Sequence, residues 1–503
     1  MATEEVVCSA GTSHVTPTTS PTTLGALRIS IESGWISKVT ALQLGCVDTL
    51  RSCRAFQGFR LRVARKTPLR VYEQKFRVGG SGDSGGSGAS SRLILPRVLK
   101  LLYDRPHFDL KPGWGLPPEL VGLVLGTQFE GDIDTVVWPH GLESVVFWRR
   151  YNRTIDNVDW PHSLKKLTLS SSFNHSLIAA KWPPKLEVLS LGSWFDQPLS
   201  AVHFPDGLTT LNLSRDFNQP LEGVLWPKRL ARLTFGFFFN RSIEAAAESW
   251  PSTLRYLSFG DCFNLPVRHA VWPRGLEEIT FGRGFNQELE GVDWPPALRR
   301  LKLGAMFNRD IAGARFPEEM EQLELGFAFN QPFAHVVLPG GLKRLIFGEE
   351  FNRDIEAVSW PQGLEEIWLG VQFDKPVAAV AWPRGLRRLR FGEMFNHPLA
   401  GVAFPYGLRE VKFGKNFNHE VQAVRWPDTL QVMAFGELFN QPISGVVWPE
   451  SLKTLQLGCE FDRRMLEGVA FPPDLGIEVV DSYRQVGDAD DCAAREDSPC
   501  HNI

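Results

Sequence analysis

The side chains best suited to chemistry in this chain are aromatic and basic ones that recur at a fixed spacing. Trp368, Arg390 and Lys412 follow one another at intervals of 22 residues, and Ile346 precedes Trp368 by the same interval. Tryptophan, tyrosine and arginine are enriched where protein interfaces gain most of their binding energy. The pattern therefore predicts a protein-binding patch. Its candidate residues are Trp368, Ile346, Arg388, Arg390, Lys412 and Tyr256.

Patterns typical of catalysis and cofactor binding are missing from the sequence. It has no nucleophile elbow, Walker loop, zinc motif or dinucleotide fingerprint. The seven cysteines show no metal-ligand spacing. Three of the eleven histidines, His175, His397 and His419, each follow a Phe-Asn pair, which makes them variants at one surface position. We therefore expect no enzymatic activity, no cofactor and no metal.

The interval of 22 residues extends through most of the chain. A proline preceded by Trp, Phe or Leu marks each copy, from Pro139 to Pro472. A two-residue insertion near Ala245 and one extra residue near Arg464 shift the later copies. A fixed period of 20–50 residues is the signature of a solenoid, in which stacked coils share one core because no coil can bury its apolar side alone.

Each copy has the pattern of one coil. Numbered from its leucine, the copy has apolar residues at positions 1, 4, 6, 10, 14, 17 and 19. Positions 4 and 6, such as Val411 and Phe413, alternate with polar residues as a strand does. Gly414 at position 7 suits a turn out of that strand. The sequence predicts a mainly β, right-handed solenoid with one long parallel sheet of about sixteen strands at the usual spacing and few helices.

Asparagine at position 11 needs its own explanation. An amide offers two donors and two acceptor sites, so a buried amide in every coil could satisfy backbone groups freed at the bend. The preceding residue is Phe in nearly every copy, which predicts a stack of rings inside the solenoid. The predicted ladder consists of Asn152, Asn174, Asn218, Asn240, Asn264, Asn286, Asn308, Asn330, Asn352, Asn396, Asn418 and Asn440.

This pattern resembles the FNIP repeat family. Phe439-Asn440-Gln441-Pro442-Ile443 matches the core motif of that family, and Phe217-Asn218-Gln219-Pro220-Leu221 is close to it. The resemblance covers residues 116–472. It implies a relative of leucine-rich repeats, although the asparagine stands at position 11 rather than 9. Some family members carry an F-box or a kinase domain in the same chain.

Outward positions of the predicted sheet carry alternating charges. Position 3 changes between acid and base along consecutive copies, as in Glu278, Arg300, Arg344 and Glu366. Parallel strands lie about 4.8 Å apart, so such charges fall within reach of one another. We expect salt bridges that fix the register and keep the surface soluble.

The part before the repeats differs in composition. Residues 1–27 are rich in Thr and Ser and predict disorder, and residues 79–91 form a Gly/Ser linker. Residues 28–78 predict a small α+β segment, with an amphipathic helix over 36–53 and strands at 59–63 and 69–72. Its basic residues are a solvated face or a polyanion-binding or nuclear-localising patch. They centre on Arg60, Arg62, Arg65 and Lys66.

Residues 50–56 look like the end of a degenerate F-box, although the usual Leu-Pro start is missing. Residues 92–115 resemble a degenerate first coil that caps the core, and residues 475–480 predict a last strand. Residues 481–503 are polar and acidic, and they predict a disordered tail.

Taken together, these features predict a non-catalytic scaffold that binds a protein through its sheet face. The net charge of −3 gives no general argument for nucleic acid, apart from the basic segment 51–77. Without a secretory signal or an apolar run of about 18 residues, we expect a cytoplasmic or nuclear protein and no membrane. One alternative is a ubiquitin-ligase substrate receptor using the degenerate F-box. A more distant alternative is a carbohydrate-active β-helix, which would need clustered carboxylates.

Overall fold

The structure is a computed structural model that describes strands at 3–10, 27–32, 59–63 and 100–103, then residues 116, 120–126, 129–244 and 250–479. The chain divides into two compact units, Met1–Phe263 and Asn264–Ile503, and each is described by itself. Both contain stacked coils of about 22 residues, with one short parallel strand in each coil.

The first unit opens with antiparallel strands and continues as a parallel stack. β1 (Thr3–Ala10) pairs antiparallel with β2 (Leu27–Glu32) and with β3 (Phe59–Val63), and β2 pairs antiparallel with β4 (Lys100–Tyr103). β4 then pairs parallel with β5 (Gly122–Leu125), as the strand of a first coil would. The parallel order continues through β6 (Ser144–Phe147), β7 (Lys166–Thr168), β8 (Val188–Ser190), β9 (Thr210–Asn212), β10 (Arg232–Thr234) and β11 (Tyr256–Ser258).

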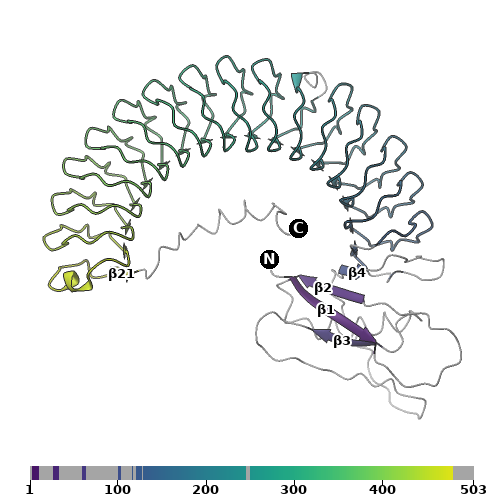
Figure 1. The fold of residues 1–503 in the computed structure, drawn as a ribbon, viewed down its shortest axis with the longest axis horizontal. Helices are drawn as coiled ribbons and strands as arrows, with labels where there is room; N and C mark the ends of the chain where they lie inside the picture. Colours follow the sequence, from purple (N-terminus) through teal and green to yellow (C-terminus); the bar gives the residue numbers. More distant parts are fainter. Residues whose placement is uncertain are drawn as a thin grey trace, which may run out of the picture. The chain divides into compact units, whose positions relative to one another are not determined.

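The second unit continues with the same coil and ends in the predicted last strand. Its strands line the inner edge of a curved stack, and the turns form the outer edge (Figure 1). Residues Arg463–Leu466 form the short 3-10 helix η4, just before the final strand. The parallel strands are β12 (Glu278–Thr280), β13 (Arg300–Lys302), β14 (Gln322–Glu324), β15 (Arg344–Ile346), β16 (Glu366–Trp368), β17 (Arg388–Arg390), β18 (Glu410–Lys412), β19 (Val432–Ala434), β20 (Thr454–Leu457) and β21 (Gly476–Val479).

The core lies where the repeat pattern predicts it. In the coil that begins at Leu408, the side chains of Val411, Phe413, Phe417 and Val421 are buried. The position-10 rings stack from coil to coil, with centroids 6.2 Å apart between Phe285 and Phe307. Because each parallel strand of the stack is only three or four residues long, much of the core comes from the turns and the extended return of the coil.

Glycine at position 7 is required by close packing between coils. A Cβ added to Gly348 would fall well inside van der Waals distance of the carbonyl oxygen of Gly326, one coil earlier. Ser170 and Ser214 stand at this position in the first unit. Their buried hydroxyls donate to the carbonyl oxygens of Tyr151 and Phe195 respectively. In these two coils the serine side chain forms a local hydrogen bond in the crowded space between coils, whereas Trp148 stands at the same position with its side chain exposed.

The asparagine ladder is present, but its predicted burial is wrong. The backbone N–H of Asn352 donates to Oδ1 of Asn330 at 3.1 Å, and the N–H of Asn330 donates to Oδ1 of Asn308 at 2.9 Å. Asn330 is only half-buried and Asn440 is exposed. The preceding Phe points inward, and successive residues of an extended chain point to opposite sides, so the amide lies at the surface of the coil.

A second ladder at position 12 was not predicted from the sequence. The side chains of Gln219, Arg241 and Arg353 donate to the backbone carbonyl of the ladder residue one coil earlier, at 3.1, 2.8 and 2.9 Å. The His419 ring nitrogen lies 3.0 Å from the carbonyl oxygen of Asn396 in the same way. Residue types that look variable at this position thus share one geometric role.

Several predictions for the ends of the chain fall on residues that the structure does not describe. The strand predicted at 59–63 is present as β3, and part of the segment assigned to disorder, Thr3–Ala10, forms β1. The run Glu4-Glu5-Val6-Val7 contains adjacent β-branched residues, which favour a strand over the disorder indicated by the surrounding Thr and Ser. Outside the described residues lie the predicted helix at 36–53, the F-box-like residues 50–56, the strand at 69–72, Arg65 and Lys66, the linker 79–91, most of the capping coil 92–115 and the tail 481–503.

Candidate functional site

The candidate site lies on the outward side of β15–β18 in the second unit. In each of these strands the central residue is fully buried, as Ile367 and Leu389 are, so its two flanking residues face away from the core. The register places Ile346 opposite Trp368 and Trp368 opposite Arg390. Residues spaced by 22 in the sequence therefore become direct neighbours across the sheet.

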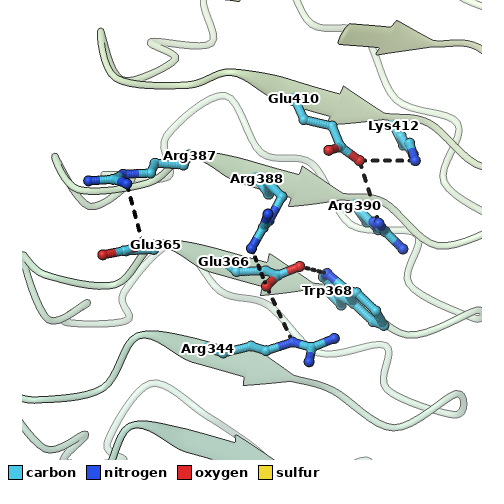
Figure 2. Close-up of polar contacts among 9 residues, drawn as sticks. All are labelled: Arg344, Glu365, Glu366, Trp368, Arg387, Arg388, Arg390, Glu410 and Lys412. Atoms are coloured by element: carbon cyan, nitrogen blue, oxygen red, sulfur yellow. Dashed lines mark hydrogen bonds and ion pairs between the residues drawn. The ribbon is translucent and has the colours of Figure 1, made fainter. Parts of the chain in front are cut away.

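The indole of Trp368 is held between two guanidinium groups. The Cζ atoms of Arg344 on β15 and Arg390 on β17 each lie 4.3 Å from the ring centroid, with the ring between them (Figure 2). The indole Nε1 donates a hydrogen bond of 2.6 Å to Oε1 of Glu366. Guanidinium groups are attracted to the negative faces of the ring, so these contacts fix the ring in one orientation.

Glu366 is the anionic centre of the group. Its side chain is only 8% exposed, and its Oε2 accepts a hydrogen bond from Arg388 Nη2 at 3.2 Å and lies 3.3 Å from Arg344 Nε. Burying a carboxylate away from water costs free energy unless the charge is paired and hydrogen-bonded. Glu366 is paired with Arg344 and Arg388, and it accepts a hydrogen bond from Trp368. It is the single charged residue that is fully buried among the residues whose side chains the structure describes.

A second carboxylate, that of Glu410 on β18, contacts two basic side chains. Oε1 of Glu410 lies 3.5 Å from Arg390 and 3.0 Å from Lys412. At the other end of the strands, Arg387 lies 3.8 Å from Glu365 (Figure 2). We call the central group the Arg–Trp face. It comprises Arg344, Glu366, Trp368, Arg388, Arg390, Glu410 and Lys412.

The structure brings together most of the predicted patch but changes its character. Trp368, Arg388, Arg390 and Lys412 lie on one surface, with half-buried Ile346 opposite Trp368. Ile346 and Trp368 do not present a purely apolar surface, because the guanidinium groups of Arg344 and Arg390 cover the Trp368 ring. The sequence-based candidates omitted Arg344, Glu366 and Glu410. All three stand at position 3, and each contacts a residue at position 5 of its own strand or of a neighbouring strand.

Tyr256 belongs to the first unit and forms a separate, smaller group. Its ring lies 4.0 Å from the Cζ atom of Arg232 on the preceding strand β10. Two exposed aromatics, Phe237 and Phe238, lie in the turn after β10, with Arg215 5.6 and 5.4 Å from their centroids. Pairing between arginine and an aromatic ring one coil away is therefore a recurrent surface feature of these coils.

The predicted charge ladder is confirmed where its pairs are described. Arg300 Nε lies 2.8 Å from Glu278, and Glu321 accepts from both Arg299 at 3.1 Å and Lys343 at 3.0 Å. The hydrogen bond from Lys343 is the main cause that lowers the pKa of Glu321. These acids are thus paired with bases on the preceding coil, the following coil or both.

Neither a metal centre nor a membrane span is found in the part of the chain that the structure describes. No group of three or more His, Cys, Asp or Glu side chains there could hold a metal ion. No helix in the same residues has the length and apolar character needed to cross a membrane.

Comparison with known proteins agrees with the geometry of the coil. The FNIP Repeat family matches residues 151–193, 195–238 and 329–372. The coils in these three stretches are FNIP repeats. None of the curated proteins matches the chain.

The FNIP coils also resemble solved leucine-rich repeat structures. The crystal structure of CroV588, a circular leucine-rich repeat protein, is 32% identical with a TM-score of 0.64 over 72% of this chain. The match spans 57% of the length of CroV588. The internalin InlF of Listeria monocytogenes is 14% identical over 68% of this chain and 87% of its own, with a TM-score of 0.37. The similarity to CroV588, together with the parallel strand in each coil, identifies the stack as a leucine-rich-repeat-like β-solenoid.

Proposed function

We propose that the protein is a non-catalytic scaffold that binds a protein partner through the Arg–Trp face. The observation that carries this proposal is the ordered group around Trp368, in which the ring is held by Arg344, Arg390 and Glu366. Arginine and tryptophan are the residue types most enriched at energetic centres of interfaces. Their side chains are ordered in the free protein, which lowers the entropy lost on binding.

The fold supports this proposal in a more general way. Leucine-rich-repeat-like solenoids are typically protein-binding scaffolds, because stacked coils present one long continuous surface. Many acids of the described sheet face are paired with Arg or Lys, as Glu366 and Glu410 are, which disfavours the acid–base pair of a carbohydrate-active β-helix. The location that we propose for this scaffold is the cytoplasm or the nucleus. No contact of the described residues favours the alternative role of ubiquitin-ligase receptor.

The proposal is tested by comparing partner capture between matched variants of the full chain. Arg388→Ala and Trp368→Ala each remove a side chain of the Arg–Trp face. The control is Arg300→Ala, because Arg300 stands at the register position of Arg388 four coils earlier and also pairs with a glutamate. We expect a partner that the wild type and Arg300→Ala retain and that Arg388→Ala and Trp368→Ala lose. The dissociation constant of that purified partner should rise tenfold or more, on the order of 2 kcal/mol for a central residue.

Two outcomes would count against the proposal. If every captured partner binds all four proteins equally, the contact lies on another surface. If Arg300→Ala loses the partner as completely as Arg388→Ala, the charge of the sheet face matters in general and the Arg–Trp face has no special part. Thermal melts of each variant separate both outcomes from a loss of folding.

A further inference from the structure

Cations outnumber acids on the Arg–Trp face and around it. β17 and β18, with the residue before each strand, carry Arg387, Arg388, Arg390, Arg409 and Lys412, against the single acid Glu410. Part of this charge is offset by Glu365 and Glu366 on the preceding coil. The surface therefore remains attractive to additional carboxylates.

The guanidinium and ammonium groups have room for such carboxylates. The side chain of Arg388 is 52% exposed although its NH2 group pairs with Glu366. A guanidinium carries five N–H donors, so one carboxylate partner leaves several donors for a second one. Lys412 is 30% exposed and has three donors, one of which faces Glu410. The existing pairs orient these groups without exhausting their donors.

An acidic segment of the same chain follows directly from this sheet. Residues 481–503 come after β21, whose register continues from β20, and they contain six acids against Arg484 and Arg495. The acids are Asp481, Asp488, Asp490, Asp491, Glu496 and Asp497. From β21 to β17 the strand spacing gives about 19 Å. A chain of nine residues, from Val479 to Asp488, spans up to about 30 Å.

We propose that residues 481–503 bind the Arg–Trp face of their own chain, with the acids at 488–491 against Arg388, Arg390 and Lys412. The proposal rests on the proposed function, because it makes the same face the place where a partner and this segment compete. Attachment through β21 holds the segment near the face at an effective concentration of about millimolar, as for a short flexible linker. A weak, salt-sensitive contact is then enough to occupy the face, and a partner must displace it.

The test is carbodiimide cross-linking of the purified full-length protein, followed by peptide mass spectrometry. The reagent joins a carboxylate to a lysine amine in contact with it. We expect an amide between Lys412 and Asp488, Asp490 or Asp491. Lys302 is the matched control, because it stands at the same register position on β13, lies 2.6 Å from Glu324 and is 51% exposed.

Arg388→Gln tests the contribution of the exposed arginine. We expect it to reduce the Lys412 cross-link about threefold, the effect of one exposed ion pair, while Arg300→Gln leaves the yield unchanged. Raising the salt concentration to about 0.5 M should also reduce the yield, because exposed charges are screened.

Three results would overturn the proposal. Equal cross-linking of Lys302 and Lys412 would show non-specific collisions. An unchanged yield in Arg388→Gln would show that the arginine makes no contact with the segment. Cross-links that join differently labelled chains, in a mixture of ¹⁵N-labelled and unlabelled protein, would assign the face to a second copy. Because no partner is present, these results are independent of whether the proposed function holds.

Discussion

The indole nitrogen of Trp368 donates a 2.6 Å hydrogen bond to the carboxylate of Glu366, two residues earlier in the same strand. Both side chains lie on one side of β16 because residues two apart in a strand share a face. The carboxylate is held in turn by Arg344 and Arg388. The orientation of the tryptophan is thus set by contacts on three adjacent coils.

Trp368→Ala should lower the free energy of unfolding by about 1–2 kcal/mol. The change removes two ring–guanidinium contacts and one hydrogen bond to a charged group, all on the surface of the sheet. Trp368→Phe should lose less, because it keeps a ring between Arg344 and Arg390. Chemical denaturation of both variants measures these differences. A loss of 4 kcal/mol or more in the alanine variant would mean that the ring is part of the core.

Asn330→Ala should destabilise the protein by about 1 kcal/mol, because the N–H of Asn352 loses its acceptor at a half-exposed position. Asn330→Asp should cost less, since Asp196 and Asp374 accept the same backbone hydrogen bond from the next coil at 2.8 and 3.0 Å. The midpoints of thermal unfolding test this order. If Asn330→Ala and Asn330→Asp unfolded at the same midpoint temperature, the hydrogen bond to Oδ1 would make no contribution to stability.

Gly348→Ala should destabilise the second unit by about 1–3 kcal/mol, because the new methyl group would overlap the carbonyl of Gly326. Gly363→Ala is the matched control, since the carbonyl oxygen of Gly340, the nearest atom of another coil, would lie 3.9 Å from the added Cβ. Denaturant titrations of the two variants give the comparison. Similar stabilities for both would show that neighbouring coils separate easily at position 7.

Glu321→Gln should reduce the loss of folding stability that the protein shows when the pH is lowered. The hydrogen bond from Lys343 lowers the pKa of Glu321 below its ordinary value of 4.5, so the folded state holds the ionised form more strongly than the unfolded state does. This contribution is present above pH 4.5 and disappears as the pH falls through the lowered value.

The wild type should therefore melt above Glu321→Gln at pH 7, and the difference should vanish in acid below the lowered pKa. High salt at pH 7 should also reduce the difference, because the side chains of Lys343 and Glu321 are 55% and 32% exposed and the pair is therefore screened. A gap in melting temperature that stays constant from pH 7 into acid would mean that packing, and not the charge, distinguishes the two proteins.

Much of the fold could be predicted from the sequence because its signals repeat. Val411 and Phe413 define a strand only weakly by themselves, but the same alternation in every copy determines which side chains are buried. The burial of Asn330 was predicted wrongly because a recurring polar residue between apolar ones is compatible with either side of an extended chain. Because the preceding Phe329 is buried, the side chain of Asn330 must point to the opposite, outer side of the chain.

The site was less accessible to sequence reasoning. The 22-residue interval makes Ile346, Trp368 and Arg390 neighbours, and this expectation is confirmed by the register. The interval does not say which way a long side chain bends. Arg344 reaches diagonally across β16 to cover the indole, and that choice depends on the electrostatics of Glu366 and the ring together.

The side-chain ladders also have a consequence for how the protein folds. Each hydrogen bond from a ladder N–H to the previous Oδ1 joins residues 22 apart, whatever the number of coils. The sequence separation of these contacts therefore does not grow with chain length, and coils can add to a folded neighbour one at a time. Removal of residues 330–351 would place Asn352 directly after Phe329, where its N–H faces Asn308. The remaining coils could thus stack on one another with the ladder of hydrogen bonds unbroken.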